Sequence, residues 1–394
     1  MRRRLAACAM SNGEEQSNVF VLNPADLAGI IDSLKQQEYE VVGPVCRDGA
    51  IVYDSIGDLE YLPAGWTTAQ EAGVCRLKRR QDNSLFGYAP GATSLKNFLH
   101  AARIRLFTAE KDNGVFRVLP NCETPPRFAF VGVRGCDLAA VTAQDKVLIE
   151  GQYTDAAYRG RRDGAFVIAV HCNEPAPTCF CASMETGPEV RGGFDVALTE
   201  VLDNERHVFL AESGSARGRE LLLAAGAPKA PTELTARAEK LHEDAANAMA
   251  RSIETGGLKE ILYSSFESHR WDDVARRCLA CGNCTMVCPT CFCVTVEDTT
   301  DLSGKRAERW RSWDSCFTQS YSYIHGGSVR MSTKSRYRQW LTHKLASWHD
   351  QFGMLGCVGC GRCITWCPVG IDITAEVAAL RASADKSGAT RSAA

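Results

Sequence analysis

The sequence lacks long apolar runs and any excess of charge of one sign. No uninterrupted apolar stretch in its 394 residues approaches the roughly 18 residues that cross a bilayer as a helix. Lys and Arg total 45 and Asp and Glu total 47, and the resulting net charge of −2 gives no bulk field that would hold nucleic acid or an anionic membrane. We therefore expect no nucleic acid and no membrane among the partners.

Motifs for nucleotides and for common hydrolytic chemistry are also missing. The chain has no G-x-G-x-x-G between a strand and a helix, no G-x-x-x-x-G-K-[ST], no H-E-x-x-H and no G-x-S-x-G in a suitable setting. The sequence thus predicts no flavin and no nicotinamide on this chain, and identifies no catalytic residue. Whether the chain is itself an enzyme stays open.

Cysteine, in contrast, is abundant, with 19 residues. An odd number in a chain of this length argues against a disulfide scaffold and favours metal ligation. Three arginines precede Cys8, but only three apolar residues lie between them and Cys8, too few for a signal peptide. We interpret residues 1–18 as a disordered leader of a cytoplasmic protein.

Two segments repeat the pattern C-x-x-C-x-x-C-x-x-x-C-P, which binds bacterial-type 4Fe-4S clusters. In such pairs the fourth cysteine of each run ligates the other cluster. Small residues such as Gly282, Gly359 and Gly361 would let the backbone approach the inorganic sulfides. The predicted ligands are Cys278, Cys281, Cys284 and Cys367 for cluster one, and Cys357, Cys360, Cys363 and Cys288 for cluster two.

Zinc is the main alternative at these two runs. It prefers two separated C-x-x-C pairs and has no use for a third cysteine at the same spacing. A thioredoxin-like pair is disfavoured because the motif occurs within triplets and outside a thioredoxin βαβ unit. Iron is therefore the predicted metal.

The N-terminal part alternates strands and helices. A helical pattern covers 25–37, with strand-like runs at 40–45 and 51–53. Buried-type strands at 128–133 and 165–170 enclose a helix over 138–149, and these two strands should be parallel.

Cys136 and Cys172 would then both lie at the carboxyl edge of the sheet, where open α/β sheets bind ligands. With Cys179 and Cys181 they could hold a third iron–sulfur cluster. A zinc site or unligated thiols remain alternatives for this set.

The remaining cysteines give weaker signals. The string Thr-Cys-Phe-Cys at 178–181 recurs at 290–293, directly after the first ferredoxin run. Because that cluster already has its ligands, we expect Cys291, Cys293 and Cys316 to be buried structural thiols. Cys8, Cys46, Cys75 and Cys122 show no grouping.

The predicted fold is an α/β N-terminal domain, a helical connector and an α+β bacterial-type dicluster ferredoxin domain. An apolar face at Leu234, Ala238, Leu241, Ala245, Met249 and Ile253 indicates core packing along the connector. Residues 301–350 carry nine Lys or Arg against four Asp or Glu, and four Trp. We interpret this insertion as favouring reduced anionic clusters and excluding water from them, rather than as a nucleic-acid surface. The boundaries are 19–212, 213–275 and 276–380, followed by a disordered tail at 381–394.

Several strings together resemble one family. They are Leu85-Phe-Gly-Tyr88, the segments 130–138 and 178–188, Cys288-Pro-Thr-Cys-Phe-Cys293, Trp313-Asp-Ser-Cys316 and the segment 357–373. Over about residues 20–378 the chain resembles the iron–sulfur beta subunit of NAD(P)-linked cytoplasmic nickel–iron hydrogenases, the sulfhydrogenases. It is also similar to the electron-transfer subunit of anaerobic sulfite reductase.

The resemblance implies a heteromeric complex in which this subunit relays electrons. Its partners would be the hydrogenase small and large subunits and a flavin- and NAD(P)-binding reductase subunit. It also implies a third cluster at Cys136, Cys172, Cys179 and Cys181. Gly135 stands where the family usually has proline, so a more flexible loop could alter that site.

Two rival functions remain at this point. Sulfite reduction uses the same chemistry, and its terminal acceptor would bind on another chain. A metal-stabilised binding module or redox sensor would pass no electrons through.

Overall fold

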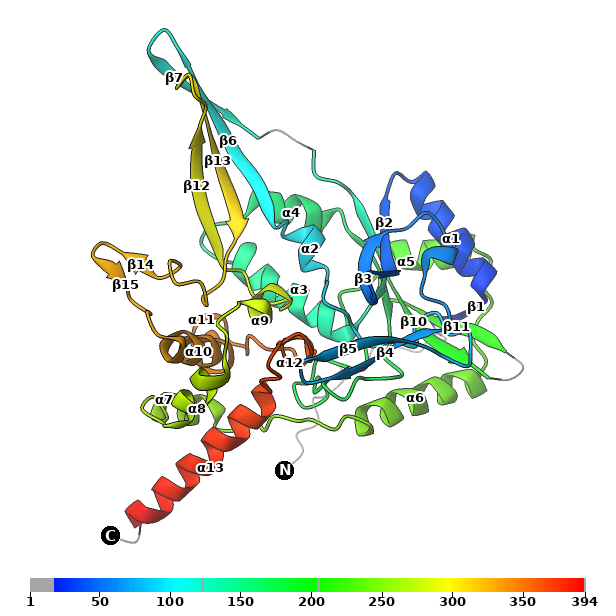
Figure 1. The fold of residues 1–394 in the computed structure, drawn as a ribbon. Coiled ribbons are helices and arrows are strands. Elements are labelled where there is room, and N and C mark those ends of the chain that lie inside the picture. The colour runs from blue at the N-terminus through cyan, green and yellow to red at the C-terminus, as the bar shows by residue number, and fades with distance from the viewer. Residues whose placement is uncertain (1–17, 122–123, 204–205, 393–394) are drawn as a thin grey trace, which may run out of the picture.

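The computed structural model describes residues 18–121, 124–203 and 206–392, with side chains to residue 384. A seven-stranded mixed sheet forms the N-terminal part, in the order β1-β11-β10-β9-β8-β2-β3 (Figure 1). β8, β9, β10 and β2 run parallel where they pair with one another, and β1, β11 and β3 add antiparallel edges. Its strands are β1 (Val19–Leu22), β2 (Glu40–Arg47), β3 (Ala50–Ser55), β8 (Phe128–Val133), β9 (Phe166–Val170), β10 (Val196–Leu202) and β11 (His207–Ser213).

Helices cover both faces of this sheet. One core packs α1 (Pro24–Gln36) and α5 (Ala216–Ala224) against Ala129, Val131 and Ile168. The other packs α2 (Lys96–Leu99), α3 (Gly135–Leu148) and α4 (Ala156–Asp163) against Phe128, Phe130 and Val167. Alternate side chains of one strand thus enter opposite cores, and burial on both faces explains the continuous apolar runs of β8 and β9.

The predicted parallel pair with a helix between its strands is confirmed by β8, α3 and β9. α3 begins at Gly135, three residues earlier than expected, and is followed by α4 before β9. Cys136 therefore lies in the first turn of α3, and Cys172 lies two residues beyond β9. Both are at the carboxyl edge of the sheet, as the sequence predicted.

The segment 213–275, expected as a connector, is shared between two cores. α5 and the first part of α6 (Thr232–Asn247) pack on the N-terminal sheet, through Leu221, Leu222 and Leu234. α7 (Leu258–Ser264) and α8 (Arg270–Arg277) pack into the C-terminal core. The expected apolar stripe ends with α6, so Met249 and Ile253 leave the helical face and contact other parts of the protein.

The C-terminal core surrounds the two ferredoxin runs. Trp271, Tyr337, Trp340 and Leu345 pack there against both cysteine runs. Its further elements are α9 (Asn283–Met286), α10 (Thr333–Thr342), a π-helical turn (His343–Ser347), α11 (Trp348–Phe352), α12 (Arg362–Thr365) and α13 (Ile373–Ser392).

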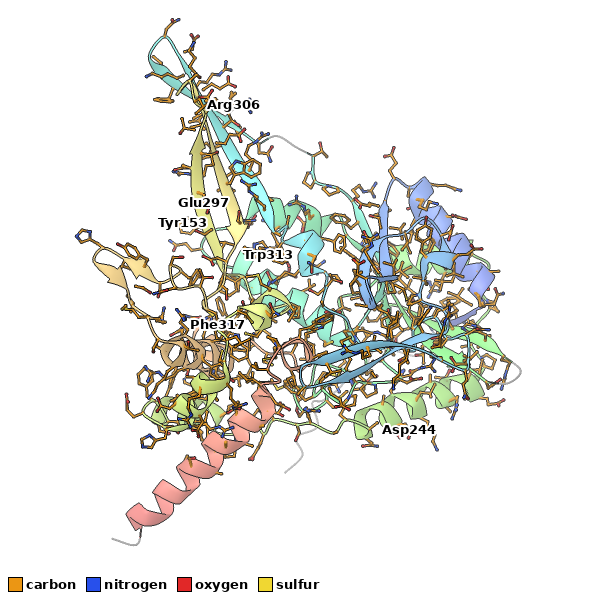
Figure 2. The ribbon with its side chains drawn as sticks, viewed as in Figure 1. Tyr153, Asp244, Glu297, Arg306, Trp313 and Phe317 are labelled. Atoms are coloured by element: carbon orange, nitrogen blue, oxygen red, sulfur yellow. The ribbon has the colours of Figure 1, made fainter. Side chains whose placement is uncertain are left out.

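A four-stranded arm extends away from both cores (Figure 1). Its order is β12-β13-β6-β7, so a hairpin from the N-terminal part pairs with a hairpin from the insertion. Figure 2 shows Arg306 toward the free end and Trp313 at the base. The strands are β6 (Arg103–Asp112), β7 (Val115–Pro120), β12 (Val294–Thr300) and β13 (Arg306–Trp313). Three smaller features are the hairpins β4 (Trp66–Glu71) with β5 (Val74–Arg79) and β14 (Tyr323–Ile324) with β15 (Gly327–Ser328), and a 3₁₀ turn at Leu59–Tyr61.

The C-terminal end of the chain is helical, although we expected it to be disordered. α13 runs to Ser392, over most of the segment 381–394 for which we expected no structure. Its many alanines explain this, since alanine has the highest helix propensity. The expected leader lies outside the described residues, apart from Asn18. Within the described ranges, no helix combines the length and apolarity that a membrane crossing requires.

Candidate metal centres

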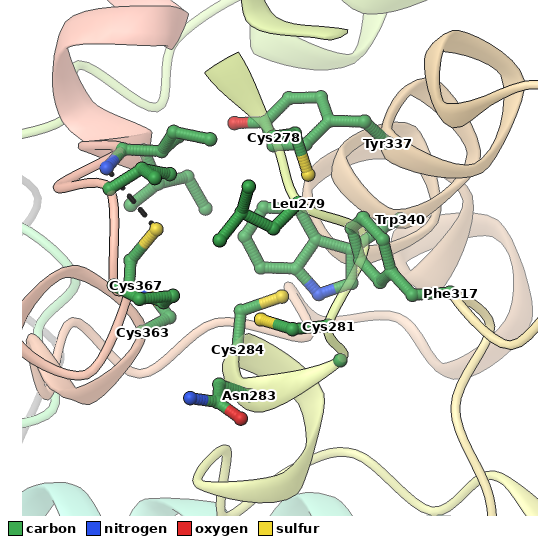
Figure 3. A pocket seen from close by; sticks show the side chains of 15 residues that line it. Cys278, Leu279, Cys281, Asn283, Cys284, Phe317, Tyr337, Trp340, Cys363 and Cys367 are labelled. Atoms are coloured by element: carbon green, nitrogen blue, oxygen red, sulfur yellow. Dashed lines mark hydrogen bonds between the residues drawn. The ribbon is translucent and has the colours of Figure 1, made fainter.

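The first cysteine group consists of Cys278, Cys281, Cys284 and Cys367. These residues line one cavity, part of it open to solvent. Cys281 is exposed, and Leu279 beside it is 64% exposed, so this group lies near the surface. Figure 3 shows the four cysteines around the cavity, together with Cys363, Phe317, Tyr337 and Trp340.

Backbone N–H groups point at two sulfurs of the first group. Ala280 N donates to Cys278 Sγ at 3.4 Å, and Ile371 N donates to Cys367 Sγ at 3.3 Å. Hydrogen bonds of this kind stabilise thiolate ligands and tune the potential of iron–sulfur clusters. Gly282, with φ of +77°, lies just before α9, between Cys281 and Cys284. A Cβ added to it would lie 3.2 Å from Ser315 Oγ.

The second cysteine group consists of Cys357, Cys360, Cys363 and Cys288. Burial raises the pKa of Cys363, and the charges of Cys357, Cys360 and Cys288 raise it further. Cys357 and Cys363 pack in the same apolar core. Cys288 comes from the first run and the other three from the second. Cys367 of the second run likewise lines one cavity with Cys278, Cys281 and Cys284 of the first run, and the crossed ligation expected from the spacing stays a prediction.

Cys288 has a charged neighbour that the sequence did not identify. Lys344 Nζ lies 3.2 Å from Cys288 Sγ and donates to Thr290 Oγ1 at 3.1 Å and to the Gly356 carbonyl at 2.8 Å. This lysine is 4% exposed and lies in the π-helical turn. Hydrogen bonding from Cys291 and the charge of Lys344 lower the pKa of Cys288. A buried ammonium thus faces one thiolate of the second group.

The third cysteine group consists of Cys136, Cys172, Cys179 and Cys181, and all four are buried. Burial raises the pKa of Cys181, and the charges of Cys179 and Cys172 add to the effect. For Cys136 the contributions after burial come from Asp137, Cys181 and Cys360. The topology therefore brings together the four cysteines that the sequence selected. Met249, which leaves the expected stripe, covers this group, with Sδ 3.9 Å from Cys181 Sγ.

The second and third groups share one packed junction. Phe180 N donates to the Gly359 carbonyl at 2.8 Å, and Thr186 Oγ1 donates to the Val358 carbonyl at 2.7 Å. Cys179 Sγ lies 3.9 Å from the carbonyl oxygen of Cys360. The loops that carry the two groups are thus in direct backbone contact.

A buried ion pair crosses this junction. Arg362, between Cys360 and Cys363, bonds Asp137, next to Cys136, with Nη1–Oδ1 at 2.8 Å and Nη2–Oδ2 at 3.0 Å. Its guanidinium also donates to the carbonyls of Gly91 and Thr93. Both partners are about 1% exposed. The pair fixes the second ferredoxin run against the first turn of α3.

Glycine at 361 is required by this junction, and alanine there should be destabilising. Gly361 has φ of +74°, and a Cβ would lie 2.5 Å from the Thr178 carbonyl oxygen. We expect Gly361→Ala to lower the free energy of unfolding by about 2–4 kcal/mol, through backbone strain and displacement of the 178–181 loop. The measurement is the unfolding midpoint of the purified protein.

Gly353→Ala is the matched control. Gly353 has nearly the same φ, +70°, but no atom within 4 Å of the added Cβ. It should cost only about 1 kcal/mol. Equal effects of the two substitutions would show that contact between the loops contributes nothing.

The packing around Gly135 also explains why glycine stands at this position. It lies in the first turn of α3, and a Cβ there would be 2.8 Å from the Glu189 carbonyl oxygen. The position is buried within a regular helix start rather than in a flexible loop.

Three cysteines outside the groups are less buried than expected. Cys291, Cys293 and Cys316 are each of intermediate exposure. Cys46 is exposed and Cys75 half-exposed. Cys8 and Cys122 lie outside the described residues.

The donor sets suit iron–sulfur clusters. Each group offers four thiols. The loops that carry them have glycine residues or backbone N–H groups next to the sulfurs. In the part of the chain that the structure describes, no three His, Cys, Asp or Glu side chains converge closely enough to hold a single metal ion. The four thiols of the first group instead line one cavity, and four cysteine thiolates are the donor set of a 4Fe-4S cluster.

Comparison with known proteins agrees with this chemistry. A family model described as a 4Fe-4S dicluster domain matches residues 277–371. The chain is 32% identical over 280 residues to sulfhydrogenase 2 subunit beta of Pyrococcus furiosus, covering 70% of this chain and 79% of that protein. No solved structure matches. The resemblance noted in the sequence is confirmed, and the chain belongs to the sulfhydrogenase beta subunits, the iron–sulfur electron-transfer subunits of a hydrogenase.

Proposed function

We propose that this subunit relays electrons through three 4Fe-4S clusters, between the hydrogenase small and large subunits and a flavin- and NAD(P)-binding reductase subunit, in the cytoplasm. The observation that carries the proposal is the arrangement of the thiols. Cys363 of the second group also lines the cavity of the first, and Cys360 packs with Cys136 and Cys181 of the third, its carbonyl oxygen 3.9 Å from Cys179 Sγ. Three adjoining groups make a continuous series across the protein.

The ligands in this proposal are those expected from the sequence. Cys278, Cys281, Cys284 and Cys367 would hold cluster one; Cys357, Cys360, Cys363 and Cys288 cluster two; and Cys136, Cys172, Cys179 and Cys181 cluster three. Such clusters supply reversible one-electron chemistry.

The protein's own residues would give each site a different environment. Cys281 and Leu279 leave the first site open to a partner, whereas burial shields the third from water. Electrons would therefore be exchanged with another subunit most directly at the first site.

Lys344 should raise the reduction potential at the second site. Its ammonium favours the more negative, reduced state of a cluster held by Cys288. Lys344→Met keeps the length of the side chain and removes the charge. We expect the midpoint potential of cluster two to fall by on the order of 50 mV, the one-electron equivalent of about 1 kcal/mol of charge-assisted hydrogen bonding. Potentiometric EPR measures this shift.

The control is Lys334→Met on the same helical segment. Lys334 is half-buried, and its ammonium bonds the Asp272 carboxylate at 2.9 Å. This variant should leave all cluster potentials in place. An unchanged or higher potential for cluster two in Lys344→Met would contradict the assigned role.

The complex itself tests the proposal. Purification without oxygen, followed by identification of the co-purifying chains and by counting of nickel and flavin, should yield a flavin subunit together with a nickel-binding large subunit. A sirohaem-binding partner in place of the nickel subunit would indicate sulfite reduction. Potentiometric EPR should show several interacting reducible centres, whereas a binding module without electron flow would show none.

A further inference from the structure

Two of the cysteines outside the three groups lie side by side at the base of the arm. Cys293 directly precedes β12, and Cys316 follows the end of β13 by three residues. The two strands pair from Val294 opposite Trp313, and Asp314 N donates to the Cys293 carbonyl at 2.9 Å. The end of the hairpin therefore holds these two residues together.

Their side chains lie close together. The side chain and backbone N–H of Cys316 and the side chain of Tyr321 all interact with Cys293. The contact with Cys316 lowers the pKa of Cys293, while the same contact raises that of Cys316. Tyr321 is 37% exposed and connects the pair with solvent. Neither cysteine belongs to the three groups.

The pair adjoins the proposed electron path. Cys316 packs against the same apolar core as Cys284 and Cys363, which belong to the first and second groups. The turn that carries it is fixed there, because Ser315 Oγ lies 2.7 Å from Thr285 Oγ1, one residue from Cys284. Phe317, on the other side, lines the cavity of the first group. Charge could thus pass between that cavity and the pair over a short, packed distance.

We propose that Cys293 and Cys316 form a redox-active dithiol that exchanges two electrons with the proposed clusters, an inference that rests on the proposed function. In reduction, the bond between Cys293 Sγ and Cys316 Sγ breaks, the two sulfurs take up two electrons from two one-electron iron–sulfur donors, and two protons give two thiols. Oxidation reverses each of these changes. Tyr321 is placed to pass the proton at Cys293 Sγ. The pair would store two electrons beside carriers that move one at a time.

The test uses the wild-type complex, poised without oxygen at a series of potentials with redox dyes. Samples are quenched in acid with an iron chelator, free thiols are alkylated with a light reagent, and disulfides are then reduced and alkylated with a heavy one. Mass spectrometry should find heavy label on Cys293 and Cys316 together, rising with potential along a two-electron Nernst curve. The twelve proposed ligands and the control thiol Cys75 should carry the light label throughout.

Variants separate a pair from two independent thiols. In Cys316→Ser, Cys293 should keep the light label at every potential, and Cys293→Ser should have the same effect on Cys316. Light label on both wild-type cysteines at all potentials would overturn the proposal. So would loss of bound iron or zinc on Cys316→Ser, because it would show a metal ligand instead.

EPR on the same samples distinguishes failure of the dithiol proposal from failure of the proposed electron-transfer function. Reducible clusters with an unreactive pair would refute the dithiol alone. Absence of clusters would refute the proposed function itself.

Discussion

Replacing Cys360 with serine is expected to abolish electron transfer through the complex while sparing chemistry at its ends. Cys360 is a thiol of the second group and packs with Cys136 and Cys181 of the third. Its loss should remove or convert cluster two, with a loss of up to about four iron atoms per chain. NAD(P)-linked hydrogenase turnover should fall at least about 100-fold. Loss of a residue that only contacts a metal ligand costs up to about 100-fold, and loss of a ligand itself should cost at least as much. Dye-linked activity of the catalytic subunits should persist.

The matched control is Cys75→Ser, at a half-exposed thiol on β5 outside the three groups. It should leave iron content and both activities unchanged. Cys281→Ser should repeat the Cys360 result at cluster one. If dye-linked activity falls together with NAD(P)-linked activity, the subunit is needed for assembly rather than conduction.

Breaking the ion pair between Asp137 and Arg362 should have the largest effect on stability. Asp137→Leu leaves the guanidinium of Arg362 buried without its counter-charge. We expect the free energy of unfolding to fall by about 3–5 kcal/mol, the usual cost of removing one partner of a buried pair. Because Cys136 and Cys360 neighbour these two residues, the iron of the second and third sites should be lost at lower temperature as well. Thermal unfolding followed by circular dichroism and by iron absorbance measures both.

The double variant Asp137→Leu with Arg362→Met serves as the control. It removes both charges, so it should be less destabilised than the sum of the single variants by more than about 1 kcal/mol. Additive effects would show that the two side chains do not act as a pair. An Asp137→Leu protein as stable as the wild type would contradict a structural role for the junction.

The sequence predicted best those features that depend on local spacing. The spacing of the two runs predicted that Cys278, Cys281 and Cys284 lie together, and these three residues line one cavity with Cys367. The crossed ligation by Cys288 and Cys367 stays a prediction. The carboxyl-edge position of Cys136 and Cys172 followed from two apolar strands with a helix between them, because such strands are parallel.

Features that depend on distant contacts were not predictable in this way. β6 and β13 are about 200 residues apart in the chain, and their pairing into one arm has no signal in either segment. In the sequence, Lys344 could be recognised only as one of several basic residues in the insertion. Its contact with Cys288 depends on the π-helical turn. Met249 continued a helical pattern in the sequence, although the helix ends at Asn247, and therefore its role beside Cys181 was missed.

In the proposed function, thiols from distant segments hold three four-iron clusters in this chain. Metal and acid-labile sulfide analysis of material purified without oxygen tests it most directly. We predict about twelve iron and about twelve sulfide per chain, four of each for every cysteine group. Stoichiometric zinc with neither iron nor acid-labile sulfide would contradict the claim.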